Sequence, residues 1–253
     1  MNSFLRMVPV MVAGLLLLGA AGPEGEQPLS PYRHYDSNTF IHGNFKPFFQ
    51  RQWKARLSPE PQPGPDGEPR VSPLLLPLSV SSFGPRSGNS APVMPKRLAE
   101  RVKPLESEQR QALENALLQL LLEYGQLLEQ QDQPQLKRNL AGAFNYFFMA
   151  SYYALRNGQE LSGAQQRSML AQINAAIAMG LNERRLSDSD KQELYESVVL
   201  SGSIILGLYN EGRDKGRPEQ QKEARELAKE LLDQMMGIRI EKVRLDGDSV
   251  WID

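Results

Sequence analysis

The sequence predicts a mainly α-helical protein, with a bundle of about five helices in residues 96–253, two of them central and apolar, and a small C-terminal β-hairpin. Three observations support this fold class. Apolar residues of the bundle recur at three- and four-residue steps. The few prolines after residue 96 fall between the expected helices. The residues after 237 change to a two-residue period. A signal peptide and a long, largely disordered Pro-rich segment are expected to precede the bundle.

The first 21 residues have the three parts of a secretory signal peptide. Arg6 gives a basic start, MVPVMVAGLLLLGAA (7–21) is an apolar run, and Gly19 and Ala21 are small enough for the peptidase. The run has 15 residues and is interrupted by Pro9, whereas a membrane-spanning helix needs about 20 residues. We therefore expect cleavage after Ala21 and no transmembrane anchor in the mature chain.

Residues 22–95 contain 14 of the 18 prolines and seven glycines. Proline removes backbone donors, and the segment has too little apolar mass to offset the entropy lost on ordering. We therefore expect a linker that is largely disordered. Residues 72–80 are apolar but contain two prolines, which favours an extended strap over the domain and excludes a central strand.

An aromatic cluster lies within this segment, at residues 32–53. The candidate partner-binding residues there are Tyr32, Tyr35, Phe40, Phe45, Phe48, Phe49 and Trp53. Aromatic side chains are costly to leave in water and are enriched at binding surfaces. Three interpretations stay open: docking on the protein's own helical domain, a linear motif for a partner, or a metal or nucleic-acid site. His34 and His42 do not have a diagnostic ligand spacing.

The first three helices of the domain follow from periodicity and capping. The first is expected at 107–131, with leucines along one face. The second is expected at 135–157 and is apolar nearly all round, so it should be central. The third should open at Ser162, which forms a capping-box pattern with Gln165, and end at Gly180.

The last two helices and the tail complete the expected domain. The fourth helix should run from about Ser187 to Gly212, and small residues inside its apolar stretch allow a neighbour to approach, which makes it the second central helix. The fifth should start at Pro218 and end at Gly237, with one apolar face, and pack on the outside. In the tail, 237–253, an Asp-Gly pair between alternating apolar residues predicts the hairpin, with its tryptophan partly buried.

Composition excludes several classes of function. The absence of cysteine excludes disulfides, a thiol nucleophile and a Cys-type zinc site. Balanced charge, 29 basic against 30 acidic residues, argues against nucleic acid as the main partner. The helical domain contains no histidine, so the commonest general base is missing, and the chain has no phosphate loop, nucleophile elbow or HExxH motif. We expect a non-enzymatic protein without a metal or cofactor.

A few residues of the domain are nevertheless candidates for chemistry. Glu193 and Glu196 lie three apart on the fourth helix and could form an acid/base pair, although paired carboxylates on a helix are usually solvated. Asn139, Asn145 and Asn174 lie in or beside apolar stretches, where a cap or an interhelical hydrogen bond is the expected role.

A candidate ligand pocket is expected between the second and fourth helices, where aromatic residues are dense. Its candidate residues are Asn145, Tyr152 and Tyr195. Asn145 is polar among aromatic neighbours, and a tyrosine can offer both an apolar ring and a hydroxyl. At helical spacing, however, such tyrosines more often belong to a core.

Two stretches resemble a known family: NLAGAFNYFFMASYYALRNGQELSGAQQ (139–166) and SDSDKQELYESVVLSGSIILGLYNEG (187–212). The shared pattern is a polar start, an aromatic-rich helix that ends in glycine, and Lys191, Gln192 and Glu196 opening a helix of small residues. The chain resembles a set of exported bacterial proteins catalogued only as a domain of unknown function. The resemblance covers most of the helical domain and implies an all-helical fold and a Gram-negative envelope protein, with no catalytic residues.

These observations predict a non-catalytic periplasmic or secreted module that binds another protein, with another envelope protein as the expected partner. The alternative is a module that binds a small apolar ligand or lipid within the bundle. An enzyme that uses carboxylates or tyrosines is a third hypothesis. The expected location is the periplasm of a Gram-negative bacterium or the extracellular space.

Overall fold

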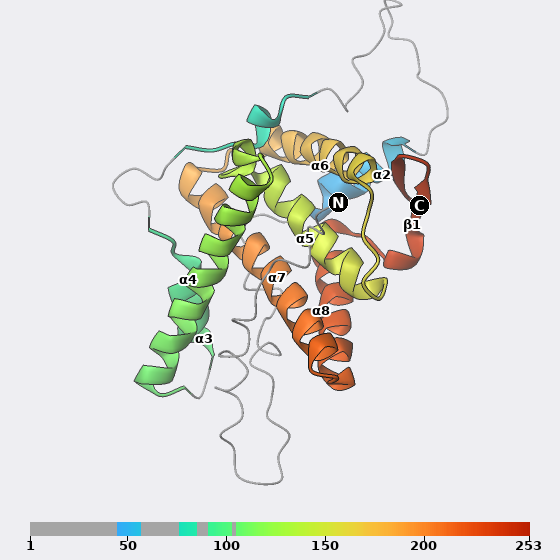
Figure 1. Ribbon diagram of the computed structural model, residues 1–253. Helices are drawn as coiled ribbons and strands as arrows, with labels where there is room; N and C mark the ends of the chain where they lie inside the picture. Colours follow the sequence, from blue (N-terminus) through green and yellow to red (C-terminus); the bar gives the residue numbers. More distant parts are fainter. Residues whose placement is uncertain (1–44, 57–75, 85–90, 103–104) are drawn as a thin grey trace, which may run out of the picture.

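The computed structural model describes residues 45–56, 76–84, 91–102 and 105–253, and these contain seven α-helices and one β-hairpin (Figure 1). The helices are α2 (Lys46–Arg56), α3 (Met94–Arg101), α4 (Ser107–Gln130), α5 (Leu140–Leu155), α6 (Gly163–Glu183), α7 (Asp188–Asp214) and α8 (Pro218–Met236). The 3-10 turns are η4 (Leu78–Ser81), η5 (Pro134–Leu136) and η6 (Ile240–Lys242), and the strands are β1 (Val243–Asp246) and β2 (Ser249–Ile252). The predicted signal peptide and Tyr32, Tyr35, Phe40, His34 and His42 lie outside the described residues.

The five predicted helices correspond to α4, α5, α6, α7 and α8, and their ends follow local capping signals. The capping box of α6 is confirmed: Gln165 N–H donates to Ser162 Oγ (3.2 Å), and Ser162 N–H donates to Gln165 Oε1 (2.9 Å). Ser187 caps α7 in the same way. Gly237 ends α8 with a φ of 66°, a left-handed conformation that glycine adopts without strain. The predicted end of α6 at Gly180 is wrong, because the helix continues for three more residues.

The centre of the bundle is the pair α5 and α7, which confirms both predicted central helices (Figure 1). Residues 140–154 of α5 are all buried. The two helices approach closely at Gly202, where a Cβ would lie 3.1 Å from the Cα of Phe147 and 3.0 Å from Cε1 of Tyr146. No side chain fits there without moving the neighbouring backbone, so the small residues of α7 set how closely the helices pack.

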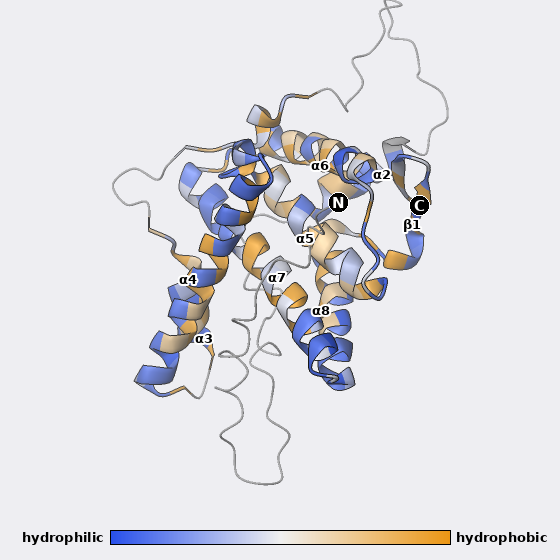
Figure 2. Ribbon diagram, viewed as in Figure 1, coloured by the Kyte–Doolittle hydropathy of each residue, from blue (hydrophilic) through white to orange (hydrophobic). Residues whose placement is uncertain are grey.

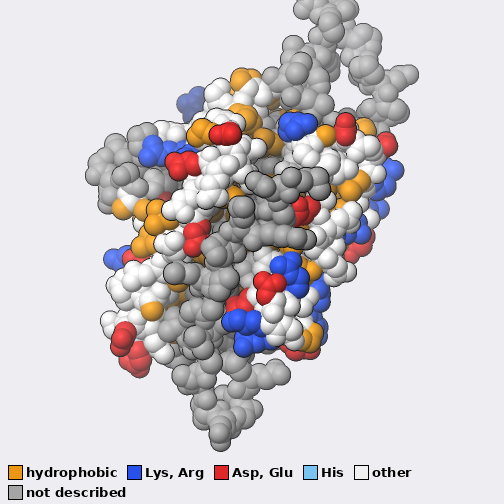
Figure 3. Space-filling view, in the orientation of Figure 1, with side chains coloured by type: hydrophobic (Ala, Val, Ile, Leu, Met, Phe, Trp, Pro, Cys, Tyr) orange, Lys and Arg blue, Asp and Glu red, His pale blue; other side chains and the backbone are white. Residues whose placement is uncertain are grey.

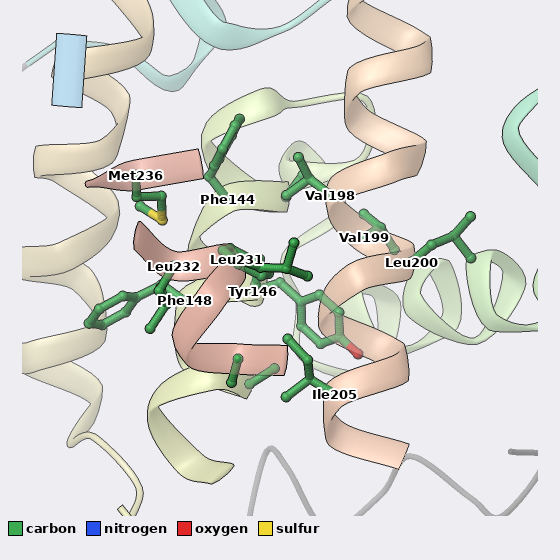
Figure 4. Packing of buried hydrophobic residues seen from close by; sticks show 14 of the residues in the cluster. Phe144, Tyr146, Phe148, Val198, Val199, Leu200, Ile205, Leu231, Leu232 and Met236 are labelled. Carbon is green, nitrogen blue, oxygen red and sulfur yellow. The ribbon is translucent and has the colours of Figure 1, made fainter. Parts of the chain in front are cut away.

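α8 covers the central pair from one side. Its Leu232 and Met236 are fully buried and lie beside Phe144 and Phe148 of α5 (Figure 4). Figure 4 also shows the Tyr146 ring turned toward α7, where its hydroxyl lies 3.1 Å from Ser203 Oγ. Ala224, Ala228 and Leu231 are also buried, and the exposed side of α8 is mostly hydrophilic (Figure 2), as expected for an outer helix.

α5 begins at Leu140, later than the predicted start near Gln135. Arg138 has a φ of 51°, a left-handed conformation that interrupts any helix from the preceding 3-10 turn. The side chain of Asn139 then accepts a hydrogen bond from Gly142 N–H at 2.8 Å and caps the new helix.

The prediction of about five helices is low by two, because α2 and α3 lie where proline dominates the composition. In α3, Pro95 occupies the first turn, where its missing N–H leaves no intrahelical bond unmade. Residues 22–95 therefore include α2, η4 and the start of α3, whereas the sequence predicted an extended linker.

The predicted C-terminal hairpin is confirmed. β1 and β2 pair in antiparallel register, with Val243 opposite Ile252. The hairpin lies on α6, where Gln172 Nε2 donates to the carbonyl of Val250 at 3.0 Å. Trp251 is half-buried, as expected. Within the described ranges, no helix combines the length and the hydropathy needed to cross a bilayer.

Candidate functional site

Four of the predicted partner-binding aromatic residues lie on or immediately before α2 and face the bundle. Phe45, Phe48, Phe49 and Trp53 are each 5% exposed or less. Their spacing of three, four and eight residues places them on one side of a helix. For these four residues the structure shows docking on the protein's own domain, one of the three interpretations that the sequence left open.

α2 packs against α6 and α8 and, through its aromatic rings, against α5, and we call the surface that it covers the α2 groove. Gly180 of α6 forms its floor. A Cβ at Gly180 would lie 2.3 Å from Cε1 of Phe45 and 3.0 Å from Cδ2 of Phe48, so any other residue would displace the aromatic side chains. Gly237, after α8, similarly leaves room for Gln50, whose Cγ would lie 2.8 Å from an added Cβ.

The aromatic face of α2 reaches the centre of the bundle. The ring centroid of Phe144 on α5 lies 5.1 Å from that of Phe49 and 6.2 Å from that of Phe45. Trp53 stacks on Phe49 with centroids 5.7 Å apart. Tilted and stacked ring pairs at these separations are favourable beyond their buried area, so the contact is specific in shape.

Polar contacts at the edge of the α2 groove fix the orientation of the helix. Trp53 Nε1–H donates to the carbonyl of Met236 at 3.1 Å, which satisfies a carbonyl at the end of α8. Lys46 pairs with Asp233 of α8 at 3.2 Å. On the other side, Arg51 pairs with Glu183 of α6 at 2.7 Å. These ion pairs are partly exposed and contribute about 0–1 kcal/mol each, so they orient α2 more than they hold it.

The model of a family of unknown function, DUF6683, matches residues 84–252, which is more than half of the chain. The chain belongs to this family. The match includes both stretches on which the predicted resemblance was based. No curated protein and no solved structure matches the chain.

α2 lies entirely before the matched residues, which we call the DUF6683 domain. The same is true of nearly all of residues 76–84, which we call the strap. The strap crosses α6 and the start of α5. The sequence predicted an extended strap over the domain at residues 72–80, without naming the helices beneath it, and η4 makes part of the segment a tight turn. Two N-terminal segments of this chain are therefore bound on the surface of its DUF6683 domain.

Two buried asparagines hold the backbone of the strap. Asn174 Nδ2 donates to the carbonyls of Leu76 (3.0 Å) and Pro77 (3.3 Å), and Asn174 Oδ1 accepts from Ser81 Oγ at 2.5 Å. Asn139 Nδ2 donates to the carbonyl of Leu78 at 2.7 Å. The expected role of these residues, a cap or an interhelical bond, is correct for the cap by Asn139. Their bonds to the strap were not anticipated.

Glu193 and Glu196 are buried beneath α3, so the expectation that paired carboxylates are solvated is wrong here. Glu196 Oε2 accepts hydrogen bonds from the backbone N–H groups of Val93 (2.8 Å) and Met94 (2.9 Å), at the start of α3. Glu193 Oε2 accepts from Arg97 at 2.6 Å. Burial raises the pKa of Glu196, which these backbone hydrogen bonds partly oppose. Both carboxylates therefore have a structural role, because their hydrogen bonds hold α3 on α7.

The structure does not bring the three predicted pocket residues together. Asn145 and Tyr152 lie two turns apart on α5, and Asn145 Nδ2 has only a 4.0 Å contact with Met149 Sδ. Tyr195 of α7 packs against Phe83 of the strap, with ring centroids 5.6 Å apart. Among the described residues, no hydrogen bond or ring contact joins these three.

A largely buried tyrosine cluster lies between α4, α5 and α7, and it contains Tyr195, one of the predicted pocket residues. The ring of Tyr124 lies 4.7 Å from that of Tyr146 and 6.1 Å from that of Tyr195. Burial raises the pKa of Tyr146 and of Tyr195 to about 12, and it also raises the pKa of Tyr124 well above its ordinary value. These hydroxyls stay protonated at neutral pH, so they cannot serve as bases there.

The described residues contain no group of three or more His, Cys, Asp or Glu side chains placed to hold a metal. On the face shown in Figure 3, basic and acidic side chains are intermixed, which is unlike the clustered basic surface of a nucleic-acid-binding protein. The arrangement that stands out is instead the α2 groove, where an amphipathic helix is bound by shape, ring contacts and a few polar groups.

Proposed function

We propose that this protein is an exported, non-catalytic interaction module whose DUF6683 domain binds an amphipathic aromatic helix in the α2 groove. In the isolated chain α2 occupies the groove, and a partner protein of the envelope presents a helix of the same chemistry. The observation that carries this proposal is the docking of α2 itself. Its four aromatic residues enter a groove whose floor requires Gly180.

The contact has the features of a helix bound in a groove. Anchors at three-, four- and eight-residue spacing face inward, and charged residues remain at the edge. Residues 57–75 separate α2 from the strap, and the family match begins only at residue 84. α2 therefore lies outside the family domain in sequence and is held on it by side-chain contacts, as a bound peptide ligand would be.

Export is supported by the N-terminal pattern. The basic start, the 7–21 apolar run and the small residues before the expected cleavage site are the parts of a secretory signal. The balanced charge of the chain favours a protein partner over nucleic acid.

The test uses the chain from residue 22 with a protease site placed between residues 60 and 70. After the folded protein is cut, a fluorescent peptide of residues 40–58 is added and its exchange into the groove is followed by anisotropy. We expect saturable binding as the resident segment leaves. In the peptide, Phe49→Ala should abolish binding, whereas Lys54→Ala, on the exposed side of α2, should leave it unchanged.

An opposite result would assign α2 a different role. If the cut segment never exchanges with peptide until the whole domain unfolds, α2 is a fixed part of the core, and the groove is not a binding site. In that case, crosslinking in the envelope should also give the same partners with and without residues 30–57.

A further inference from the structure

A cluster of two arginines and two tyrosines lies where the end of α5 meets α7 and α8. Tyr153 comes from α5, Tyr209 and Arg213 from the last two turns of α7, and Arg225 from α8. Nothing in the proposed function uses these residues. On α5 and α8 they lie about two turns or more along the helix from Phe144 and Asp233, which contact α2. They are candidates for a site of their own.

The two tyrosine hydroxyls converge on the loop after α5. A Cβ on Gly158 would lie 3.7 Å from the hydroxyl oxygens of both Tyr153 and Tyr209. The rings meet edge to face, with centroids 5.4 Å apart. Gly158 has a φ of 85°, so a residue without a side chain brings the loop backbone close to both hydroxyls, at the edge of two tyrosine side chains that are otherwise buried.

The arginines place positive charge beside these hydroxyls. Arg213 Nη1 donates to the Tyr153 hydroxyl at 2.5 Å, so Tyr153 keeps its own proton to donate. Burial raises the pKa of Tyr209, and the positive charges of Arg225 and Arg213 partly oppose that rise. Arg225 has one hydrogen bond, to Asn157 Oδ1 at 3.5 Å.

The acidic groups nearby do not neutralise this charge. Asp214 pairs with Arg213 Nε at 3.0 Å and the Tyr153 hydroxyl accepts from Nη1, which leaves Nη2 of that guanidinium without a hydrogen bond among the described residues. Glu211, in the same turn of α7, is bound by Lys215 and Arg217. No carboxylate of the described residues forms an ion pair with Arg225, which is half-buried. The cluster therefore carries net positive charge in a partly desolvated position.

We propose that Arg213, Arg225, Tyr153 and Tyr209 form a binding site for a phosphate group. Guanidinium groups bind oxyanions through paired, charge-assisted hydrogen bonds, and hydroxyls can donate to the remaining oxygens. Donors that come from three helices approach from different directions, which suits a tetrahedral anion. The phosphate can belong to the free ion or to a lipid headgroup, and the two sources share this chemistry.

The test measures binding by the chain from residue 22 in two arms. One arm titrates inorganic phosphate by calorimetry. The other measures sedimentation with vesicles of phosphatidylglycerol and phosphatidylcholine in equal parts, against phosphatidylcholine alone. We expect Arg225→Gln to weaken binding at least about tenfold in the arm that binds, since a charge-assisted contact is lost. Tyr209→Phe should weaken it less.

Arg217→Gln is the matched control, because it removes the same charge from an exposed residue whose ion pair is with Glu211. It should leave binding unchanged. Phosphate binding lost in Arg225→Gln assigns the site to the free ion, and vesicle binding lost in that variant assigns it to a headgroup. Equal weakening by Arg225→Gln and Arg217→Gln, or no binding in either arm, overturns the proposal.

Discussion

The centre of the bundle and the two N-terminal segments are held by different kinds of contact. α5 and α7 meet through apolar side chains and through a close backbone approach at Gly202. The strap is held by the amides of Asn139 and Asn174, and α2 by an aromatic face with a polar edge. The centre depends on continuous close packing, whereas each segment depends on a few side chains that can be removed one at a time.

This difference has a thermodynamic consequence. A substitution in the centre destabilises every conformation in which the bundle is folded, so its whole cost appears in global unfolding. A substitution in a separable segment can cost no more than the free energy that docks the segment, because beyond that point the segment simply detaches. Matched substitutions in the two regions should therefore differ in extent even where the chemistry is the same.

The largest effect is expected from Phe147→Ala in the centre. Phe147 is fully buried, and its Cα lies against Gly202 of α7. Removing a buried phenyl ring should lower the free energy of unfolding by about 3–5 kcal/mol, because both the transfer energy and the cavity count against the fold. Urea denaturation followed by circular dichroism measures this loss. A cost below about 1 kcal/mol would mean that the centre is not closely packed.

The same substitution at Phe49, also fully buried, should have a smaller global effect. Phe49→Ala should release α2, so that amides of residues 45–56 lose protection from hydrogen exchange while those of α5 keep theirs. Lys54→Ala is the control and should change neither. If protection falls equally in α2 and α5, the two regions form one cooperative unit and the comparison fails.

The next prediction concerns the strap. Asn174→Ala removes two hydrogen bonds to strap carbonyls and leaves the buried Ser81 hydroxyl without its partner, at a cost of about 2 kcal/mol in thermal or urea unfolding. Asn145→Leu is the matched contrast, because Asn145 is also buried but its Oδ1 has no hydrogen-bond partner among the described residues. That variant should be neutral or stabilising. A loss above about 1 kcal/mol at Asn145 would instead indicate a bound water or ligand there.

The sequence was sufficient to predict α4 through α8 and the hairpin, because those elements are specified by local signals. Ser162 and Ser187 cap the helices that follow them, and Gly237 ends α8. The continuous apolar character of residues 140–154 identified a central helix without reference to any neighbour. Arg138 shows the limit of such local signals. Its left-handed backbone delays the start of α5, but arginine is not a residue type that indicates this conformation in a sequence.

The candidate site was only partly predictable, because its geometry depends on residues far apart in the chain. The aromatic residues of α2 were recognised as a cluster, but proline-rich surroundings hid the helix that carries them. Gly180 was interpreted as a helix end, whereas it makes room for Phe45, more than 130 residues earlier. Likewise the amide of Asn174 signalled a buried partner without identifying the strap. Arg225 and Tyr209 lie on different helices, so no spacing within one segment of the sequence indicates that they are near each other.

The smallest expected effect is a pair of Gly→Ala substitutions that should shift the Tm in opposite directions, and it tests how closely the centre is packed. At Gly125 of α4, an added Cβ would meet nothing nearer than Lys137 Cε at 4.0 Å, so Gly125→Ala should gain about 1 kcal/mol from helix propensity and raise the Tm by about 2–4 °C. The same change at Gly202 should lower the Tm, because the methyl group would lie 3.1 Å from the backbone of Phe147. Differential scanning calorimetry of both variants measures the two shifts. If Gly202→Ala were stabilising as well, α5 and α7 would have room to separate, and a ligand between them would again be a reasonable hypothesis.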